Sequence, residues 1–144
     1  MQTVQQLLAK KGSAAWSVAP SATVFDALRL MAEKEVGALL VLEEERLVGV
    51  LSERDYARKV FLKGKSSPQT LVREIMTARV VTVRPEQSIE ECMALMTVHR
   101  IRHLPAVAGD QVVGVVSIGD VVKASLEAKD FLIKQLENYI TGSP

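Results

Sequence analysis

The sequence predicts a mixed α/β (α+β) fold: two β-α-β-β-α units packed sheet to sheet around a pseudo-two-fold axis, with an extra helix at the C-terminus. The first observation is a repeat, since residues 17–58 match residues 82–123 without a gap when the chain is shifted by 65 positions. The second is that each copy holds a short extended segment, helical periodicity and two apolar runs. The third is size, because a unit of about 50 residues cannot bury both faces of a sheet alone. Two units packed together would bury a shared core.

Each copy begins with a short extended segment, at 17–18 and at 81–83, that runs into a proline. A helix follows, and a capping box is predicted from Thr23 with Asp26 and from Ser88 with Glu91. Apolar residues then recur at i, i+3, i+4 and i+7, which predicts a helical face packed on a core. These residues are Val24, Ala27, Leu28 and Met31 in the first copy, and Ile89, Cys92, Met93 and Met96 in the second.

Two apolar strands follow each helix, with a polar turn between them that predicts a hairpin. The strands are expected at 38–42 and 47–51, and at 104–107 and 112–116. A second helix opens at Ser52 in the first copy and at Ser117 in the second.

The elements divide the chain into four parts. We expect a first unit with a lead-in helix at 1–63, a polar linker at 64–70, a second unit at 71–128, and a C-terminal helix with a tail at 129–144. That last helix carries an apolar stripe which the two units do not need, so it either folds back or packs on a second chain. We favour a homodimer.

The composition excludes several classes of protein. Hydrophobic residues make up 48% of the 144 residues and the net charge is +1, so neither nucleic acid nor a membrane surface is an expected partner. Cys92 is the only cysteine, which excludes an internal disulfide. No secretory signal pattern is present at the N-terminus. We therefore expect a cytoplasmic protein.

A Gly-x-x-Ser-x-x-Asp pattern occurs twice, at 49–55 and at 114–120. One interpretation is structural, since a serine and an aspartate three residues apart cap a helix. The other is functional: unpaired N–H groups and a hydroxyl at a helix start bind phosphate, and the carboxylate can accept hydrogen bonds from a ribose diol. The glycine could mark a bulge.

The duplicated pattern resembles the cystathionine-β-synthase (CBS) domain family, in which two units form a Bateman module, and resembles small stand-alone bacterial members of it. The resemblance rests on both Gly-x-x-Ser-x-x-Asp runs, on 75–77 (Ile-Met-Thr) leading into 81–85, and on 100–105 (Arg-Ile-Arg-His-Leu-Pro). In that family the serines and aspartates contact adenosine nucleotides. The resemblance implies a regulatory module, not an enzyme, for AMP, ADP, ATP or NAD, with S-adenosylmethionine less favoured and no catalytic cofactor. A separate effector protein would receive the signal.

The resemblance also implies two composite clefts, each joining the Ser-x-x-Asp of one unit to strand entrances of the other. Site A would contain Val50, Ser52, Asp55, Val80, Val81, Ile101, Arg102 and His103, with Arg54 and Arg58 in reach of a phosphate. Site B would contain Trp16, Ser17, Val36, Gly37, Ala38, Val115, Ser117 and Asp120. Because Gly37 and Ala38 stand where site A has Arg102 and His103, we expect site A to bind phosphate groups more tightly.

Two alternatives remain open: a structural dimerisation module whose clefts stay empty, and an enzyme of an unrecognised type. No nucleophile–base pair or glycine-rich phosphate loop supports the enzyme. His99 and His103 have a spacing that suits metal on a helix, but Pro105 ends the helix and no third ligand is near, so no metal is expected. Cys92 is expected to be a buried core thiol.

Overall fold

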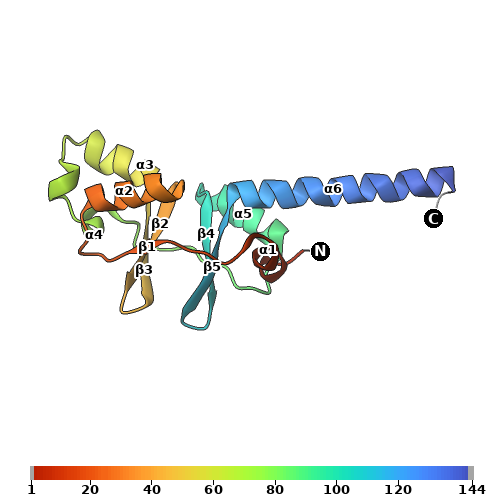
Figure 1. Ribbon diagram of the computed structural model, residues 1–144, viewed down its shortest axis with the longest axis horizontal. Helices are drawn as coiled ribbons and strands as arrows, with labels where there is room; N and C mark the ends of the chain where they lie inside the picture. Colours follow the sequence, from red (N-terminus) through yellow and green to blue (C-terminus); the bar gives the residue numbers. More distant parts are fainter. Residues whose placement is uncertain (1, 143–144) are drawn as a thin grey trace.

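The computed structural model describes residues 2–142, and Figure 1 shows two small α/β units side by side with one long helix projecting from the second. The first unit contains β1 (Ser17–Val18), α2 (Val24–Lys34), β2 (Ala38–Glu43), β3 (Arg46–Ser52), α3 (Glu53–Tyr56) and a π-helical turn (Ala57–Phe61). The second contains α5 (Ile89–His99), β4 (His103–Ala108), β5 (Gln111–Ser117) and α6 (Ile118–Thr141). Two short lead-in helices, α1 (Val4–Lys11) and α4 (Val72–Ile75), precede the units, and a 3₁₀ turn (Ser67–Gln69) lies in the linker.

Both predicted hairpins are present, extended by a residue at most ends. β2 pairs antiparallel with β3 from Ala38 opposite Ser52, and β4 pairs with β5 from His103 opposite Ser117. Each hairpin has a register shift at the same place, so even the irregularity is repeated. β3 and β5 are in contact where the two sheets meet (Figure 1).

The first strand forms in only one of the two copies. β1 pairs parallel with β2, and the Leu40 amide donates to the Trp16 carbonyl at 3.0 Å. In the second copy the strand predicted at 81–83 is reduced to an isolated bridge between Val83 and Ala106. The reason is Pro105, which stands where Leu40 stands in the first copy and has no N–H to donate. The second sheet therefore has two strands and the first has three.

Helices α2 and α5 begin where the sequence predicts, but only one has the full capping box. Ser88 accepts from the Glu91 amide, and the Glu91 carboxylate accepts from the Ser88 amide. Thr23 accepts from the Asp26 amide, whereas the Asp26 carboxylate lies 3.8 Å from the Arg29 guanidinium and does not return to Thr23. The box predicted at Thr23 is therefore only half formed.

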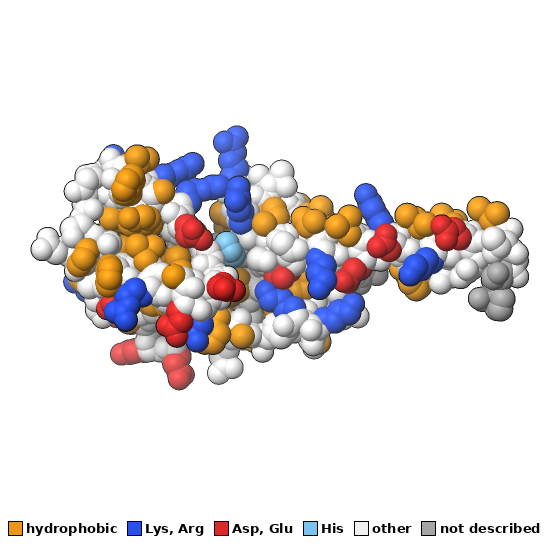
Figure 2. All heavy atoms as spheres, turned by 45° about the horizontal axis from the view of Figure 1, so that its top comes forward, with side chains coloured by type: hydrophobic (Ala, Val, Ile, Leu, Met, Phe, Trp, Pro, Cys, Tyr) orange, Lys and Arg blue, Asp and Glu red, His pale blue; other side chains and the backbone are white. Residues whose placement is uncertain are grey.

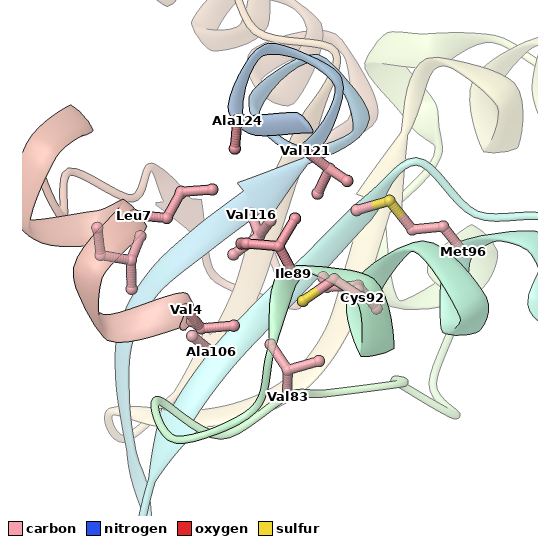
Figure 3. Packing of buried hydrophobic residues seen from close by; sticks show 12 residues of the cluster. Val4, Leu7, Val83, Ile89, Cys92, Met96, Ala106, Val116, Val121 and Ala124 are labelled. Atoms are coloured by element: carbon pink, nitrogen blue, oxygen red, sulfur yellow. The ribbon is translucent and has the colours of Figure 1, made fainter. Parts of the chain in front are cut away.

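The lead-in helices are exchanged between the units. α1 precedes the first unit in sequence, yet Val4, Leu7 and Leu8 are buried in the core of the second, as Figure 3 shows for Val4 and Leu7. α4 precedes the second unit, yet Val72 and Ile75 are buried in the core of the first. Backbone hydrogen bonds anchor both helices, because the first amide of α1 donates to a carbonyl before α5 and the first amide of α4 donates to one before α2.

Two separate cores replace the single shared core that the sequence suggested. One cluster belongs to the first unit with α4, and the other belongs to the second unit with α1. Each core is closed by the unit's own helices and one exchanged helix, while the two sheets meet at β3 and β5. Cys92 is buried in the second cluster, as predicted, and burial raises the pKa of its thiol to about 11.

The glycines of the repeated pattern lie where the exchanged helices approach the strands. A Cβ atom on Gly49 would lie 2.6 Å from the Met76 sulfur and 3.1 Å from the Thr77 carbonyl oxygen. A Cβ atom on Gly114 would lie 2.8 Å from a methyl carbon of Leu8. Both glycines therefore make room for the residues of, or just after, a lead-in helix. This close approach explains the repeated glycine.

Two other predictions need correction. Met93 was expected on the buried face of α5, but it is exposed, and its sulfur accepts a hydrogen bond from Ser125 of α6 at 3.6 Å. The C-terminal helix expected from 129 is the continuation of the helix that opens at Ser117, and residues 143–144 of the predicted tail lie outside the described residues. Over residues 2–142, no helix is both long and apolar enough to cross a membrane.

We expect Gly49→Ala to lower the free energy of unfolding by about 1–3 kcal/mol, because the new methyl group meets Met76 and a backbone carbonyl. Gly119→Ala is the matched control, since its nearest neighbour would be 3.7 Å away in the first turn of α6. There alanine should be neutral or stabilise by up to about 1 kcal/mol. Urea denaturation measures both, and an unchanged midpoint for Gly49→Ala would contradict the packing argument.

Candidate functional site

The serine and aspartate of each repeated pattern cap a helix. Ser52 accepts from the Asp55 amide at 3.2 Å, and the Asp55 carboxylate accepts from the Ser52 amide at 2.9 Å. Ser117 and Asp120 make the same pair of bonds at 3.2 and 2.8 Å. The structural interpretation of the pattern is therefore correct in both copies, and any binding role is additional to it.

The first amides of these helices are mostly engaged. The Glu53 amide donates to the Gly37 carbonyl at 3.0 Å, and the Ile118 amide donates to the Arg102 carbonyl at 2.9 Å. The third amide of each helix donates to the capping serine. The unpaired N–H groups that the sequence suggested as a phosphate cradle are thus largely consumed inside the protein. Side chains are therefore the main groups left to recognise a phosphate.

Site A is a cleft of about 390 Å³ between the two units, within the size range of small-molecule pockets. The first unit contributes the end of β3 and the start of α3, and the second contributes the segments before β4. Of the predicted residues, those that line it are Val50, Ser52, Arg54, Asp55, Val80, Val81, Ile101, Arg102 and His103. The lining residues that the prediction missed are Gly37, Glu53, Thr77, Arg79 and Arg100.

Arg58 is the one predicted residue of site A that does not line the cleft. It lies in the π-helical turn after α3, where the wider winding changes the direction in which successive side chains point. Its neighbour Lys59 turns inward instead, donating to the Ile75 carbonyl at 2.9 Å and lying 3.1 Å from Asp55. Lys59 reaches Asp55 from outside the cleft, because it is not among the lining residues.

Site A is rich in arginine. Arg54, Arg79, Arg100 and Arg102 line it together with two carboxylates, and Figure 2 shows Lys and Arg side chains gathered over the junction of the units. Arg54 donates to the Arg100 carbonyl at 3.0 Å, which links the first unit to the second across the cleft. Within residues 2–142, the side chains of Arg79 and Arg102 make no hydrogen bond or ion pair, so both guanidinium groups are available to an anion.

Site B has the same size, about 390 Å³, and a different character. The predicted residues that line it are Trp16, Val36, Gly37, Ala38, Val115 and Ser117. Lys11, Ala14, Ala15, Glu35, Leu39, Leu40, Val50, His103 and Pro105 complete the lining. The Trp16 ring also holds the Lys34 ammonium group 4.4 Å from its centroid.

Two predicted residues are absent from the lining of site B. Ser17 follows Trp16 in an extended segment, so its side chain points to the other face. Asp120 is covered by Lys11, whose ammonium nitrogen lies 2.5 Å from a carboxylate oxygen of Asp120 and 2.9 Å from the Val115 carbonyl oxygen. Burial acts to raise the pKa of Asp120, but hydrogen bonds from Lys11 and Ser117 outweigh it, and the pKa lies below its usual value.

His103 stands in the wall between the sites, since His103, Gly37 and Val50 line both. Burial lowers the pKa of His103, and the charges of Lys11 and Arg102 lower it further, against the opposing effect of Asp120 and Glu53. The imidazole is therefore neutral near pH 7. It supplies a hydrogen-bond donor or acceptor to either site but no charge.

A sequence signal for two of the missed residues existed. Residues 4–8 echo 72–76, and extending this match by three residues places Lys11 opposite Arg79. Arg79 lines site A and Lys11 lines site B, so these two residues occupy matching positions of the repeat, as Ser52 and Ser117 do. Across residues 2–142, no group of three or more His, Cys, Asp or Glu side chains is placed to hold a metal ion.

Comparison with known proteins gives a consistent answer. The CBS domain model matches residues 14–61 and 72–127. The CBS domain-containing protein CBSX3, mitochondrial, of Arabidopsis thaliana is 39% identical over 150 residues, covering 97% of this chain and 72% of the relative. A solved CBS-domain protein from Burkholderia ambifaria MC40-6 is 50% identical with a TM-score of 0.85, covering 88% of this chain and 95% of that one.

A more distant structure shares the fold. The CBS domain pair of protein MJ0100, solved in complex with 5′-methylthioadenosine and S-adenosyl-L-methionine, is 21% identical with a TM-score of 0.79. The superposition covers 89% of this chain and 98% of that one. With the family model matching both halves of the repeat and close relatives along nearly the whole chain, this chain belongs to the CBS domain family and carries two CBS domains in tandem.

Proposed function

We propose that this CBS pair is a regulatory module that binds an adenosine nucleotide between its two units and passes the signal on through its dimer or an effector protein. The observation that carries the proposal is site A: an apolar-walled cleft at the unit boundary that combines a buried carboxylate with two unpaired arginines. The MJ0100 pair, which has the same fold, binds two adenosine compounds, and this supports the ligand class.

Each part of the ligand has a suitable partner in site A. Val50, Val80, Val81 and Ile101 offer an apolar surface to the adenine ring. The Asp55 carboxylate can accept hydrogen bonds from the ribose hydroxyls. Arg79 and Arg102 can donate bidentate, charge-assisted hydrogen bonds to phosphate oxygens.

The charge of the cleft favours some adenosine ligands over others. Four arginines against two carboxylates suit the anionic phosphates of ADP, ATP or NAD. S-adenosylmethionine carries a positive sulfonium group, which those arginines would repel. We therefore rank it below the nucleotides at site A. Turnover of the ligand is not part of the proposal.

A homodimer is the second part of the proposal. Beyond the body of the second unit, α6 exposes a row of large apolar side chains, visible as orange spheres along the projecting helix in Figure 2. They are Phe131, Leu132, Ile133, Leu136, Tyr139 and Ile140. An exposed apolar surface of this length on a helix commonly packs against another chain.

We expect ADP, ATP or NAD to raise the melting temperature by several degrees, because a ligand at 100 times its Kd adds about 2.7 kcal/mol to the stability. Differential scanning fluorimetry with a panel that also includes AMP and S-adenosylmethionine measures this shift. Asp55→Asn, which keeps the size of the capping side chain, should remove most of it. No shift with any of the five compounds at millimolar concentration would contradict the proposed function.

Arg79→Ala should weaken ADP binding at site A by about tenfold, because a charge-assisted hydrogen bond to phosphate is lost. Arg58→Ala is the matched control: it removes the same charge from the same region but does not line the cleft. Isothermal titration calorimetry at two salt concentrations should show a weaker salt dependence for Arg79→Ala only. Equal losses in the two variants would indicate a general field effect and no direct contact.

Leu132→Glu combined with Leu136→Glu should convert a dimer into a monomer, because charged groups would enter the apolar contact. Lys134→Glu, on the same stretch of helix, should leave the dimer intact. Light scattering on the full chain gives the mass directly. A monomeric wild-type protein, or a dimer that survives the double substitution, would remove α6 from the proposal.

A further inference from the structure

Lys11 binds Asp120, the carboxylate of site B, from inside the cleft. It is the last residue of α1, it lines site B, and its ammonium group binds both Asp120 and the Val115 carbonyl. The Lys11 and Asp120 side chains are only 34% and 22% exposed, so this ion pair is better shielded from water than an ordinary surface pair. Asp120 is consequently excluded from the lining.

In site A, no cation of residues 2–142 binds the carboxylate from inside the cleft. There the Thr77 amide donates to the Val50 carbonyl at 2.9 Å, and the Thr77 hydroxyl lies 3.3 Å from Asp55. One neutral residue makes both contacts that Lys11 makes in site B. Asp55 is also paired with Lys59, but from outside the cleft. Asp55 therefore faces its cleft, and Asp120 does not.

We propose that Lys11 is an internal occupant of site B that selects its ligand. A nucleoside can reach Asp120 only by displacing the Lys11 ammonium group. A phosphate-bearing ligand offers that ammonium group a new partner. The inference rests on the proposed function, since it takes the same ligand class for site B.

The surroundings of Lys11 permit this exchange. Gly12, which follows it, has a left-handed φ of 99° with nothing within 4 Å of its missing side chain, and residues 12–16 form no helix or strand. The ammonium group sits at the end of a flexible four-carbon stem. A ligand that carries both a ribose and a phosphate can therefore bind the carboxylate and the ammonium group at once, whereas adenosine offers the ammonium group no anion in place of Asp120 and leaves it only the Val115 carbonyl.

The ratio of ADP to adenosine affinity at site B tests the proposal. In an Asp55→Asn background, which silences site A, Lys11→Met should raise adenosine affinity by roughly fivefold or more, because no ion pair has to be broken. The same change should reduce the preference for ADP, since the phosphate loses its cation. Lys11→Arg, which keeps the positive charge, should retain the wild-type ratio of ADP to adenosine affinity. Calorimetry with adenosine and with ADP measures all of these.

Lys10→Met is the matched control. Lys10 lies beside Lys11 on α1 and pairs with Glu127 of α6 at 3.4 Å, but it does not line site B. Its loss should leave the ADP to adenosine ratio unchanged, and circular dichroism verifies that every variant is folded. Unchanged adenosine affinity in Lys11→Met, with ADP still bound at site A of the wild type, overturns this inference alone. No binding of either compound to the wild-type protein, in which site A is intact, overturns the proposed function with it.

Discussion

The packing of an exchanged helix against a bare glycine is the contact on which the rest of the structure depends. α4 brings Met76 against Gly49, and α1 brings Leu8 against Gly114, at distances that no Cβ atom could share. The same approach closes both cores. It also carries Thr77, one residue after Met76, and Lys11, three residues after Leu8, to the carboxylates at the starts of α3 and α6. Core packing and the lining of the clefts therefore both depend on the close approach of a lead-in helix to a glycine.

The pseudo-symmetry is broken at few positions, and each break has a chemical cause. Pro105 lacks the amide that Leu40 donates, and the second sheet loses a strand. α1 is longer than α4, so a lysine side chain reaches the place that backbone and hydroxyl groups of Thr77 fill in the other copy. The clefts therefore have equal volumes but different charges. A duplicated unit has produced two different sites with a common wall at His103.

Most of the architecture could be predicted because it depends on local sequence patterns and because each pattern occurs in both copies of the repeat. Capping residues, hairpins and strand-to-helix corners follow from neighbours within a few positions. The misses have both local and long-range causes. Arg58 was misplaced because a π-helical turn leaves no clear mark in the sequence, and Asp120 because its partner Lys11 lies 109 residues away. The exchange of the lead-in helices could not be predicted either, since an apolar periodicity indicates that a helix face is buried but not which core receives it.

That exchange also sets the order in which the molecule can assemble during synthesis. The first unit has every segment of its core once α4 has left the ribosome. α1, although it is made before the first unit, must wait for residues 83–124 before its buried face has a partner. The eight residues of α1 thus stay exposed on a nascent chain whose next domain is already complete. The docking of α1 then joins a segment made before the first unit to one made after it, and closes the second core and site B in one step.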